Sequence, residues 1–257
     1  MNKIAKAFAD KKAFIAYLMA GDPSLEQSAQ MILTAQEAGA DLIEIGIPFS
    51  DPVAEGPVIQ EASERALAAG TRLDGVFAMV RSISGQMQVP MVFMTYLNPV
   101  FVYGYDRFFA ECAEIGVSGV IIPDLPFEEQ GEAKDSAAKH GVELVTLVAP
   151  TSRERVALLA QQAEGFLYLV SSLGVTGMRG GVSSDVTDIV ADIRQVTDLP
   201  VAVGFGVSTP EQAAHYAALA DGVIVGSAIV DIVGQYGTEA RQPLYDYIKS
   251  MKDVVAL

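Results

Sequence analysis

Short apolar runs alternate with helix-like segments eight times along this chain. The apolar runs, each of strand length, are 14–19, 41–47, 89–96, 118–124, 142–149, 166–172, 199–206 and 221–227. The segments that follow them carry apolar residues at helical spacing; they are 24–39, 56–70 with 73–83, 107–116, 127–141, 152–165, 183–197, 210–220 and about 228–253. Strands that are apolar on both faces are typical of parallel sheets covered by helices. The pattern therefore predicts a parallel α/β fold.

The number of repeats favours a closed barrel over an open sheet. Eight strand–helix pairs in 257 residues match the size of a (β/α)8 barrel, also called a TIM barrel. An open doubly wound sheet is the alternative, but no dinucleotide-binding glycine fingerprint follows the first strand. No linker, low-complexity segment or charge block marks a domain boundary. We therefore expect residues 1–257 to form a single barrel domain.

Composition excludes several kinds of partner. A formal charge of −15 argues against binding a nucleic-acid backbone or an anionic membrane surface, because both need basic clusters.

The chain has one cysteine, Cys112, which cannot form an internal disulfide and fits a reducing compartment. Lys11 and Lys12 precede an apolar run that has roughly the length of the apolar region of a signal peptide. However, the sequence GDPS, a turn and helix cap, follows this run at once. We therefore expect a core strand there, and a cytoplasmic protein.

The second strand carries a carboxylate in its middle. Side chains alternate between faces along the run LIEIGI (42–47), so the three isoleucines share one face and Glu44 lies on the other. The isoleucine face should meet the helices, which places Glu44 inside the barrel near its mouth. Active sites of such barrels lie at the C-terminal ends of the strands. A buried unpaired carboxylate is costly, so we interpret Glu44 as a functional residue.

The residues at the strand ends narrow the chemistry. No lysine lies at a strand end, where it could form a Schiff base, and His140 and His215 both fall in helical segments. One cysteine and two remote histidines cannot build a zinc site or a Ser-His-Asp triad. The polar side chains that remain are carboxylates and tyrosines: Glu44, Glu55, Asp124, Tyr17, Tyr96 and Tyr168. This set favours general acid–base chemistry without a metal.

Glycine-rich loops after the last three strands indicate a phosphate site. They read GVTG (174–177), GFGVS (204–208) and VGSA (225–228). Barrels of this kind often bind phosphate at the last loops and at the N-terminus of a short helix. Backbone N–H groups and the helix dipole then replace a cation. We therefore expect this acidic chain to bind a phosphate ester.

These features together resemble one known family. The run IEIGIPFSDPVAEGPVIQ (43–60) closely resembles the signature of the tryptophan synthase alpha subunit. So do AGDPS (20–24), PDLP (123–126), SSLGVTG (171–177), GFGVS and VGSA, and the resemblance covers essentially the whole chain in order. It implies a (β/α)8 barrel with extra short helices. It also implies a lyase that cleaves indole-3-glycerol phosphate to indole and glyceraldehyde 3-phosphate in tryptophan biosynthesis.

The resemblance further implies a partner and assigns the two carboxylates. The partner is a beta subunit, in a complex of two alpha and two beta chains, which receives indole through a tunnel. It carries the PLP, so no cofactor is expected in this chain. Glu44 corresponds to the acid that protonates indole C3, and its apolar position should raise its pKa. Glu55 corresponds to the group that removes or stabilises the indole N–H proton, where most members have Asp.

The resemblance assigns the indole pocket to side chains from several strands. Tyr17 stands where the family usually has Phe and would pack near the indole. Met94 and Tyr96, both expected on the third strand, and Phe205 would line the same pocket. Tyr168, expected on the sixth strand, would approach the catalytic glutamate.

Two glycine-rich regions and one loop complete the assignment. Thr176 and Gly177 would belong to a mobile lid, with Thr176 meeting the carboxylate of the second loop on closure. Gly206, Gly226 and Ser227 match the phosphate-binding positions of the family.

The loop after the second strand is also expected to contact the partner. It is apolar and proline-rich, and the resemblance assigns Pro48, Asp51 and Pro52 to the beta-subunit interface. Other functions stay open at this point. An indole-glycerol phosphate synthase or a ribulose-phosphate epimerase should show a strand-end lysine or metal-binding histidines, and neither is found. A stand-alone indole lyase and a non-enzymatic barrel that regulates a beta subunit are the remaining alternatives.

Overall fold

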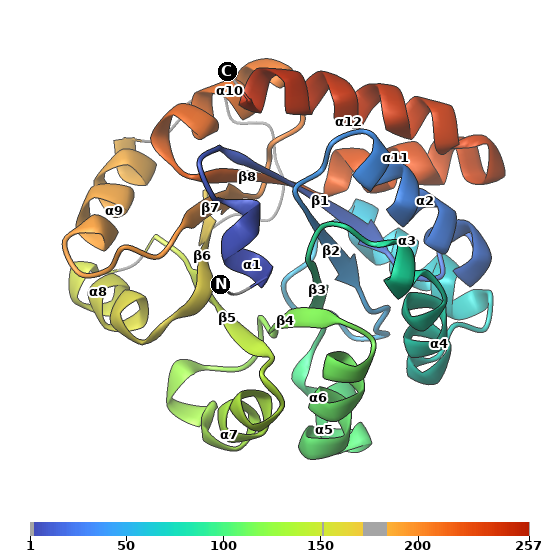
Figure 1. Ribbon diagram of the computed structural model, residues 1–257, viewed down its shortest axis with the longest axis horizontal. Helices are drawn as coiled ribbons and strands as arrows, with labels where there is room; N and C mark the ends of the chain where they lie inside the picture. The colour runs from blue at the N-terminus through green and yellow to red at the C-terminus, as the bar shows by residue number, and fades with distance from the viewer. Residues whose placement is uncertain (1–2, 151, 172–183, 257) are drawn as a thin grey trace.

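The chain forms a closed barrel of eight parallel strands surrounded by helices (Figure 1). The computed structural model describes residues 3–150, 152–171 and 184–256. The strands follow one another in chain order around the barrel, and β1 pairs with β8 to close it. They are β1 (Ala13–Met19), β2 (Leu42–Gly46), β3 (Met91–Met94), β4 (Val117–Ile121), β5 (Glu143–Val148), β6 (Glu164–Val170), β7 (Val201–Gly204) and β8 (Gly222–Val225). The (β/α)8 prediction is confirmed.

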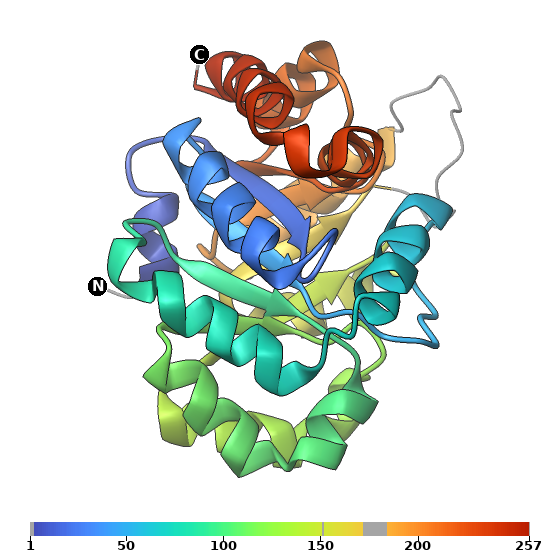
Figure 2. The ribbon, with the colours of Figure 1, turned by 90° about the vertical axis from the view of Figure 1, so that its right-hand side faces the viewer.

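The larger helices cover the outside of the barrel, as the side view also shows (Figure 2). They are α2 (Leu25–Glu37), α3 (Pro57–Ala68), α4 (Leu73–Ile83), α5 (Leu97–Tyr103), α6 (Tyr105–Glu114), α7 (Gly131–His140), α8 (Arg153–Gln162), α9 (Ser184–Arg194), α10 (Pro210–Leu219), α11 (Ser227–Tyr236) and α12 (Arg241–Val255). Short 3-10 turns lie at η1 (Ser84–Gln86), η2 (Phe127–Glu129) and η3 (Gly237–Glu239). The repeated strand–helix order places every strand end at the same rim of the barrel.

One short helix closes the opposite end of the barrel. In Figure 1, α1 (Lys3–Ala7) lies across the middle of the ring of strands. Its Ile4 is fully buried with interior residues such as Ile15 and Phe166, and the rings of Phe8 and Phe166 lie 5.6 Å apart. This helix is too short for a periodic pattern of apolar residues to predict it from the sequence. It fills the N-terminal end of the barrel, so the C-terminal rim is left for a site.

Three details differ from the sequence-based prediction. Strand β3 ends at Met94, and Tyr96 is the residue before α5, a short helix that the sequence did not indicate. The C-terminal helical stretch is divided in two, because Gly237 has φ +52° and the chain turns there between α11 and α12. Positive φ values suit glycine, but one glycine in a helical pattern did not by itself identify a break.

The alternation of side chains in β2 agrees with the prediction. Ile43 and Ile45 pack in the core between the barrel and its helices, whereas Leu42 belongs to the barrel interior. Glu44 is on the same face as Leu42 because strand side chains alternate. The apolar outer face therefore fixes the register of β2 and turns its carboxylate inward.

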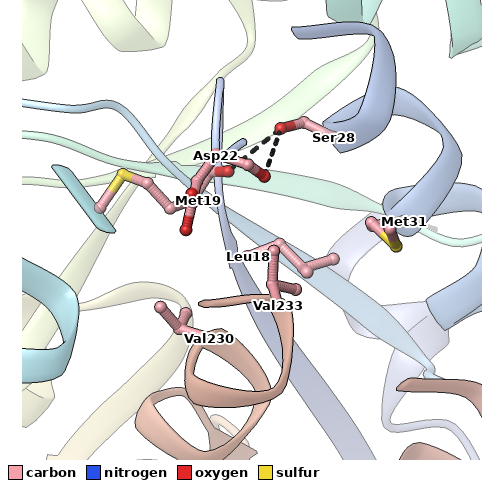
Figure 3. Close-up of a pocket in the computed structure, with 7 residues that line it drawn as sticks. All are labelled: Leu18, Met19, Asp22, Ser28, Met31, Val230 and Val233. Atoms are coloured by element: carbon pink, nitrogen blue, oxygen red, sulfur yellow. Dashed lines mark hydrogen bonds between the residues drawn. The ribbon is translucent and has the colours of Figure 1, made fainter. Parts of the chain in front are cut away.

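A small cavity lies outside the barrel, between β1 and its covering helices (Figure 3). Its volume is about 10 Å³, the lower limit for one water molecule. The Ser28 hydroxyl beside it accepts the Gly21 N–H at 2.8 Å and lies 3.3 Å from the carbonyl oxygens of Met19 and Asp22. The polar groups on this wall are thus paired, and we interpret the cavity as a packing void.

A buried carboxylate joins the first strands to the last helix. Asp41 accepts hydrogen bonds from Lys11 and Lys252, both at 2.5 Å, and from the Phe14 backbone N–H at 2.8 Å. Asp41 is buried, and Lys252 on α12 is nearly so. The cluster therefore holds α12 against β1 and the start of β2.

We expect Asp41→Ala to lower the free energy of unfolding by about 3 kcal/mol, because Lys252 loses its partner in a buried setting. Asp253→Ala is the matched control, since Asp253 pairs with Lys249 one turn away on the exposed face of α12. Its loss should be below about 0.5 kcal/mol. Urea unfolding of both variants measures the difference. Equal losses would show that the Asp41 cluster does not hold α12 in place.

Candidate active site

The inner layer near the C-terminal rim carries several of the site residues predicted from the sequence. Tyr17 and Glu44 are direct register partners on the adjacent strands β1 and β2. Tyr168 belongs to the interior cluster, and Met94 packs against both this cluster and the one that contains Tyr17. Four predicted site residues from four strands therefore converge inside the barrel.

The carboxyl group of Glu44 is buried without a charged partner. Glu44 is 1% exposed, and its Oε2 atom has no hydrogen-bond partner in the described part of the chain. Burial disfavours the charged form and raises its pKa to about 8. Glu44 is consequently protonated at neutral pH, which is the state that a general acid needs.

Two tyrosines reach across to glycines on the next strand. A Cβ atom on Gly46 would lie 2.0 Å from the Tyr17 hydroxyl oxygen, and one on Gly204 would lie 2.6 Å from that of Tyr168. Each glycine is two residues beyond the register partner of the tyrosine. Glycine at these positions makes room for the phenol rings, so the two hydroxyl groups are directed toward the mouth.

Glu55 lies at the mouth, in the loop between β2 and α3. Partial burial raises the pKa of its carboxyl group to about 7, although a hydrogen bond with the Tyr96 hydroxyl acts in the opposite direction. Tyr96 also accepts the Ala54 N–H at 3.2 Å and stacks on Phe49, with ring centroids 5.3 Å apart. Tyr96 therefore holds this loop and its carboxylate over the barrel.

Some anchors of the site were not indicated by the sequence. The Ser63 hydroxyl on α3 accepts the Phe49 N–H at 2.8 Å and donates to the Phe49 carbonyl at 2.9 Å. The Ser171 hydroxyl donates to the Phe205 carbonyl at 2.6 Å, and Phe205 lies edge-on to Tyr168. Serine in a helix or after a strand carries no pattern that distinguishes such an anchor from a surface residue.

Asp124, the third carboxylate predicted at a strand end, binds the start of helix α5. Its side chain accepts the Leu97 backbone N–H at 2.9 Å, at the first residue of α5. A carboxylate at a helix N-terminus satisfies an otherwise unpaired donor and interacts favourably with the helix dipole. We therefore interpret Asp124 as a residue that fixes the start of α5.

The N-terminus of α11 is open toward the site. Gly226 precedes the helix, Ser227 begins it, no side chain caps it, and its first turn has no acidic residue. By contrast, α10 begins with a complete capping box between Thr209 and Gln212. Free N–H groups at a helix N-terminus form an anion site. The third predicted phosphate residue, Gly206, has φ +77° in the exposed turn after β7.

The predicted partner residues lie on the loop after β2. Pro48 is buried, Pro52 is half-buried and Asp51 is exposed. Val53 in the same loop is strongly exposed, as are Phe101 and Val102 on α5. Since Tyr96 directly precedes α5 and holds this loop, these apolar side chains belong to two neighbouring segments of the rim. Thr176 and Gly177, which were predicted to belong to a lid, lie outside the described residues.

The described residues contain neither a cluster of metal-ligating side chains nor a membrane-spanning helix. Across 3–150, 152–171 and 184–256, no group of three or more His, Cys, Asp or Glu side chains is placed to hold a metal ion. In the same ranges, no helix has the length and apolar character needed to cross a membrane.

Comparison with known proteins identifies the family. The family model described as tryptophan synthase alpha chain matches residues 4–256. The tryptophan synthase alpha chain of Lacticaseibacillus casei is 45% identical over 255 residues, covering 99% of this chain and 96% of the relative. The chain belongs to the tryptophan synthase alpha chain family. The alpha chain of Synechococcus elongatus is 49% identical over 229 residues, covering 88% of this chain and 86% of that relative.

Solved tryptophan synthase structures show the same architecture. A chain of the Mycobacterium tuberculosis tryptophan synthase superimposes with a TM-score of 0.91 at 37% identity, covering 100% of this chain and 99% of the other. A chain from the tryptophan synthase α2β2 complex of Pyrococcus furiosus gives a TM-score of 0.86 at 36% identity. The match covers 95% of this chain and 99% of the other. The fold of this chain is therefore that of solved tryptophan synthase chains.

We expect Glu44→Gln to stabilise the fold increasingly as pH rises. The folded state keeps a proton on Glu44 up to about pH 8, whereas the unfolded chain releases it near 4.5. Wild-type stability is therefore lost through this window, and glutamine, which does not titrate, avoids the loss. The advantage of the variant should grow by on the order of 3 kcal/mol between pH 5 and pH 8. Urea unfolding at both pH values measures it.

Glu64→Gln is the matched control, because Glu64 is an exposed glutamate on α3. Its difference from wild type should be the same at pH 5 and pH 8. If the Glu44→Gln difference were equally flat, Glu44 would not be held neutral in the folded state.

Proposed function

We propose that this chain cleaves indole-3-glycerol phosphate to indole and glyceraldehyde 3-phosphate, with Glu44 as the acid and Glu55 as the base. The observation that carries the proposal is the buried carboxyl of Glu44, whose pKa is raised to about 8, facing a site whose second carboxylate has a pKa of about 7. Two carboxyl groups whose environments separate their pKa values can act as acid and base together. The reaction itself follows from membership of the tryptophan synthase alpha chain family.

The first step forms an electron sink within the substrate. Neutral Glu44 gives its proton to indole C3, while ionised Glu55 takes the proton from the indole nitrogen. The product is an indolenine, which can accept the electrons of a neighbouring carbon–carbon bond. At this stage the negative charge has moved from Glu55 to Glu44.

The second step breaks the bond and restores both carboxyl groups. The hydroxyl group next to the scissile bond loses its proton to Glu44, and its carbon becomes the aldehyde of glyceraldehyde 3-phosphate. The bonding electrons pass into the indolenine as its nitrogen regains the proton from Glu55, which yields indole. The protons therefore balance, and no other acid or base is required.

The phosphate group is proposed to bind at the N-terminus of α11. The free backbone N–H groups around Gly226 and Ser227 support this position, with Gly206 across the neighbouring turn. Phe205, Met94 and the tyrosine rings would surround the indole. Thr176 and Gly177 remain predicted lid residues.

The beta subunit is proposed to bind at the rim formed by the loop after β2 and by α5. Pro48, Asp51 and Pro52 were predicted there, and the exposed apolar side chains on the same loop and on α5 support this surface. We infer an assembly of two alpha and two beta chains, in which PLP belongs to the beta subunit. Contact there would order the loop that carries Glu55.

An indole-release assay on indole-3-glycerol phosphate, with and without a beta subunit, tests the reaction. Glu44→Gln and Glu55→Ala should each lower kcat by about 10²–10⁴, because each removes an acid or base. Glu55→Asp should stay active, and the beta subunit should accelerate the wild type. Glu64→Gln should match the wild type. More than about a tenth of the rate in Glu44→Gln would remove Glu44 from the mechanism, and equal rates with and without the partner would indicate a stand-alone indole lyase.

We expect Gly226→Val to raise KM for indole-3-glycerol phosphate about tenfold or more, with a smaller effect on kcat. A Cβ atom fits at this position, 3.6 Å from the Cβ of Tyr17, but the two methyl groups would crowd the approach to the α11 N–H groups. Gly85→Ala is the control, because a Cβ there meets open space. Calorimetry with glycerol 3-phosphate gives an independent measure. Unchanged affinity in Gly226→Val would place the phosphate elsewhere.

A further inference from the structure

The hydroxyl group of Tyr17 is buried without a hydrogen-bond partner. Tyr17 is 4% exposed, and its hydroxyl oxygen is unpaired in the described part of the chain. A buried donor without a partner costs about 1–3 kcal/mol, a loss that phenylalanine would avoid. Position 46 is glycine, and any side chain there would collide with this hydroxyl group. This loss of stability is explained if the hydroxyl group forms a hydrogen bond only when substrate is bound.

The strand register places the Tyr17 hydroxyl on the side of Glu44 that is nearer the barrel mouth. Tyr17 is the register partner of Glu44, and its ring extends over Gly46, two residues closer to the barrel mouth. Gly46 is the last residue of β2, and the loop that follows carries Glu55. The hydroxyl group thus stands above Glu44 on the side from which the loop approaches.

The charges around the three tyrosines single out Tyr17. Burial raises the pKa of Tyr17 well above its usual value, and Glu55, Glu44, Tyr96 and Tyr168 raise it further. Burial is also the main cause of the raised pKa values of Tyr168 and Tyr96; of the described carboxylates, Glu44 raises the pKa of Tyr168 further, whereas Glu55 and Asp124 raise that of Tyr96. Tyr17 is therefore the tyrosine that both catalytic carboxylates affect. It remains a neutral phenol, which can donate one hydrogen bond.

We propose that Tyr17 is a positioning residue that gives its one hydrogen bond to whichever of the two carboxylates is ionised. This inference rests on the proposed function. In the ground state the ionised group is Glu55; once the indolenine has formed, it is Glu44. Rotation about the C–O bond and a small shift of the Glu55 loop move the hydrogen bond from one carboxylate to the other. The phenol keeps its proton throughout, so the proton balance of the reaction is unchanged.

The hydrogen bond follows the charge as the reaction proceeds. When Glu44 loses its proton to C3, a carboxylate forms in a buried site, where a donor stabilises it most. Hydrogen bonds to charged groups are the stronger kind. The Tyr17 hydroxyl therefore stabilises the state that follows protonation, without contact with the phosphate.

Tyr17→Phe tests the proposal in the alpha–beta complex. The wild-type pH profile of kcat, which reports the substrate complex, should be bell-shaped, with an acid limb from ionisation of Glu55 and a basic limb from ionisation of Glu44. Loss of a donor to a carboxylate raises its pKa, so both limbs should move to higher pH, by about half a unit or more. We expect kcat to fall about 10- to 100-fold and KM to change less than about twofold.

Two further measurements separate positioning from a packing role. The melting temperature of Tyr17→Phe should be equal to or above that of the wild type, since an unpaired buried hydroxyl is removed. In a Glu55→Asp background, where the carboxylate is displaced by about 1.5 Å, Tyr17→Phe should shift the acid limb less than it does in the wild type, because the two residues are coupled, whereas the shift of the basic limb from Glu44 should remain. Tyr236→Phe is the matched control; Tyr236 is exposed at the end of α11 and should show wild-type rates.

A Tyr17→Phe enzyme with the wild-type kcat and pH limbs would overturn the role of Tyr17. The proposed function would survive that result if the wild type releases indole and Glu44→Gln does not. An equal shift of the acid limb by Tyr17→Phe in the wild-type and Glu55→Asp backgrounds would also refute the link between Tyr17 and Glu55. A wild-type chain that releases no indole with its partner would instead refute both proposals.

Discussion

The burial of one carboxyl group, that of Glu44, constrains the whole rim of this barrel. An acid with its pKa raised to about 8 needs an apolar setting with no cation beside it. A lysine or arginine placed near Glu44 to bind the substrate phosphate would favour the ionised acid and remove its proton. The phosphate site proposed at the backbone N–H groups of α11 avoids this conflict, because their partial charges act over a short distance. Tyrosines and glycines, which carry no positive charge, fill the space between.

The two carboxylates differ in how they are held, and this suits their proposed tasks. Glu44 is fixed by the register of β2, whose outer isoleucines are locked in the core. Glu55 is held by Tyr96, which also stacks on Phe49, in a loop that Ser63 ties to α3. An acid on a strand keeps its environment, whereas a base on a loop can respond to whatever binds at the rim. A partner can therefore regulate the base without disturbing the acid.

The sequence predicted the barrel and the inward direction of Glu44 because period-two alternation reports which face a side chain is on. It did not predict that Asp124 caps α5, or that Tyr96 precedes that helix and is not in β3. Both depend on where a strand stops, and apolar periodicity does not fix that to the residue. Nor did it predict that Tyr17 and Tyr168 lie over Gly46 and Gly204. Such contacts join different strands, so their evidence is not in any one segment.

The tyrosine-over-glycine pairs make the order of substitutions matter during divergence of this chain. Alanine at position 46 would collide with the Tyr17 ring, so it becomes acceptable only after a smaller side chain has replaced Tyr17. The reverse order passes through a damaged intermediate. The same dependence links positions 204 and 168. Lineages that keep the tyrosines are therefore bound to keep the glycines, and the paired positions should be inherited together as epistatic units.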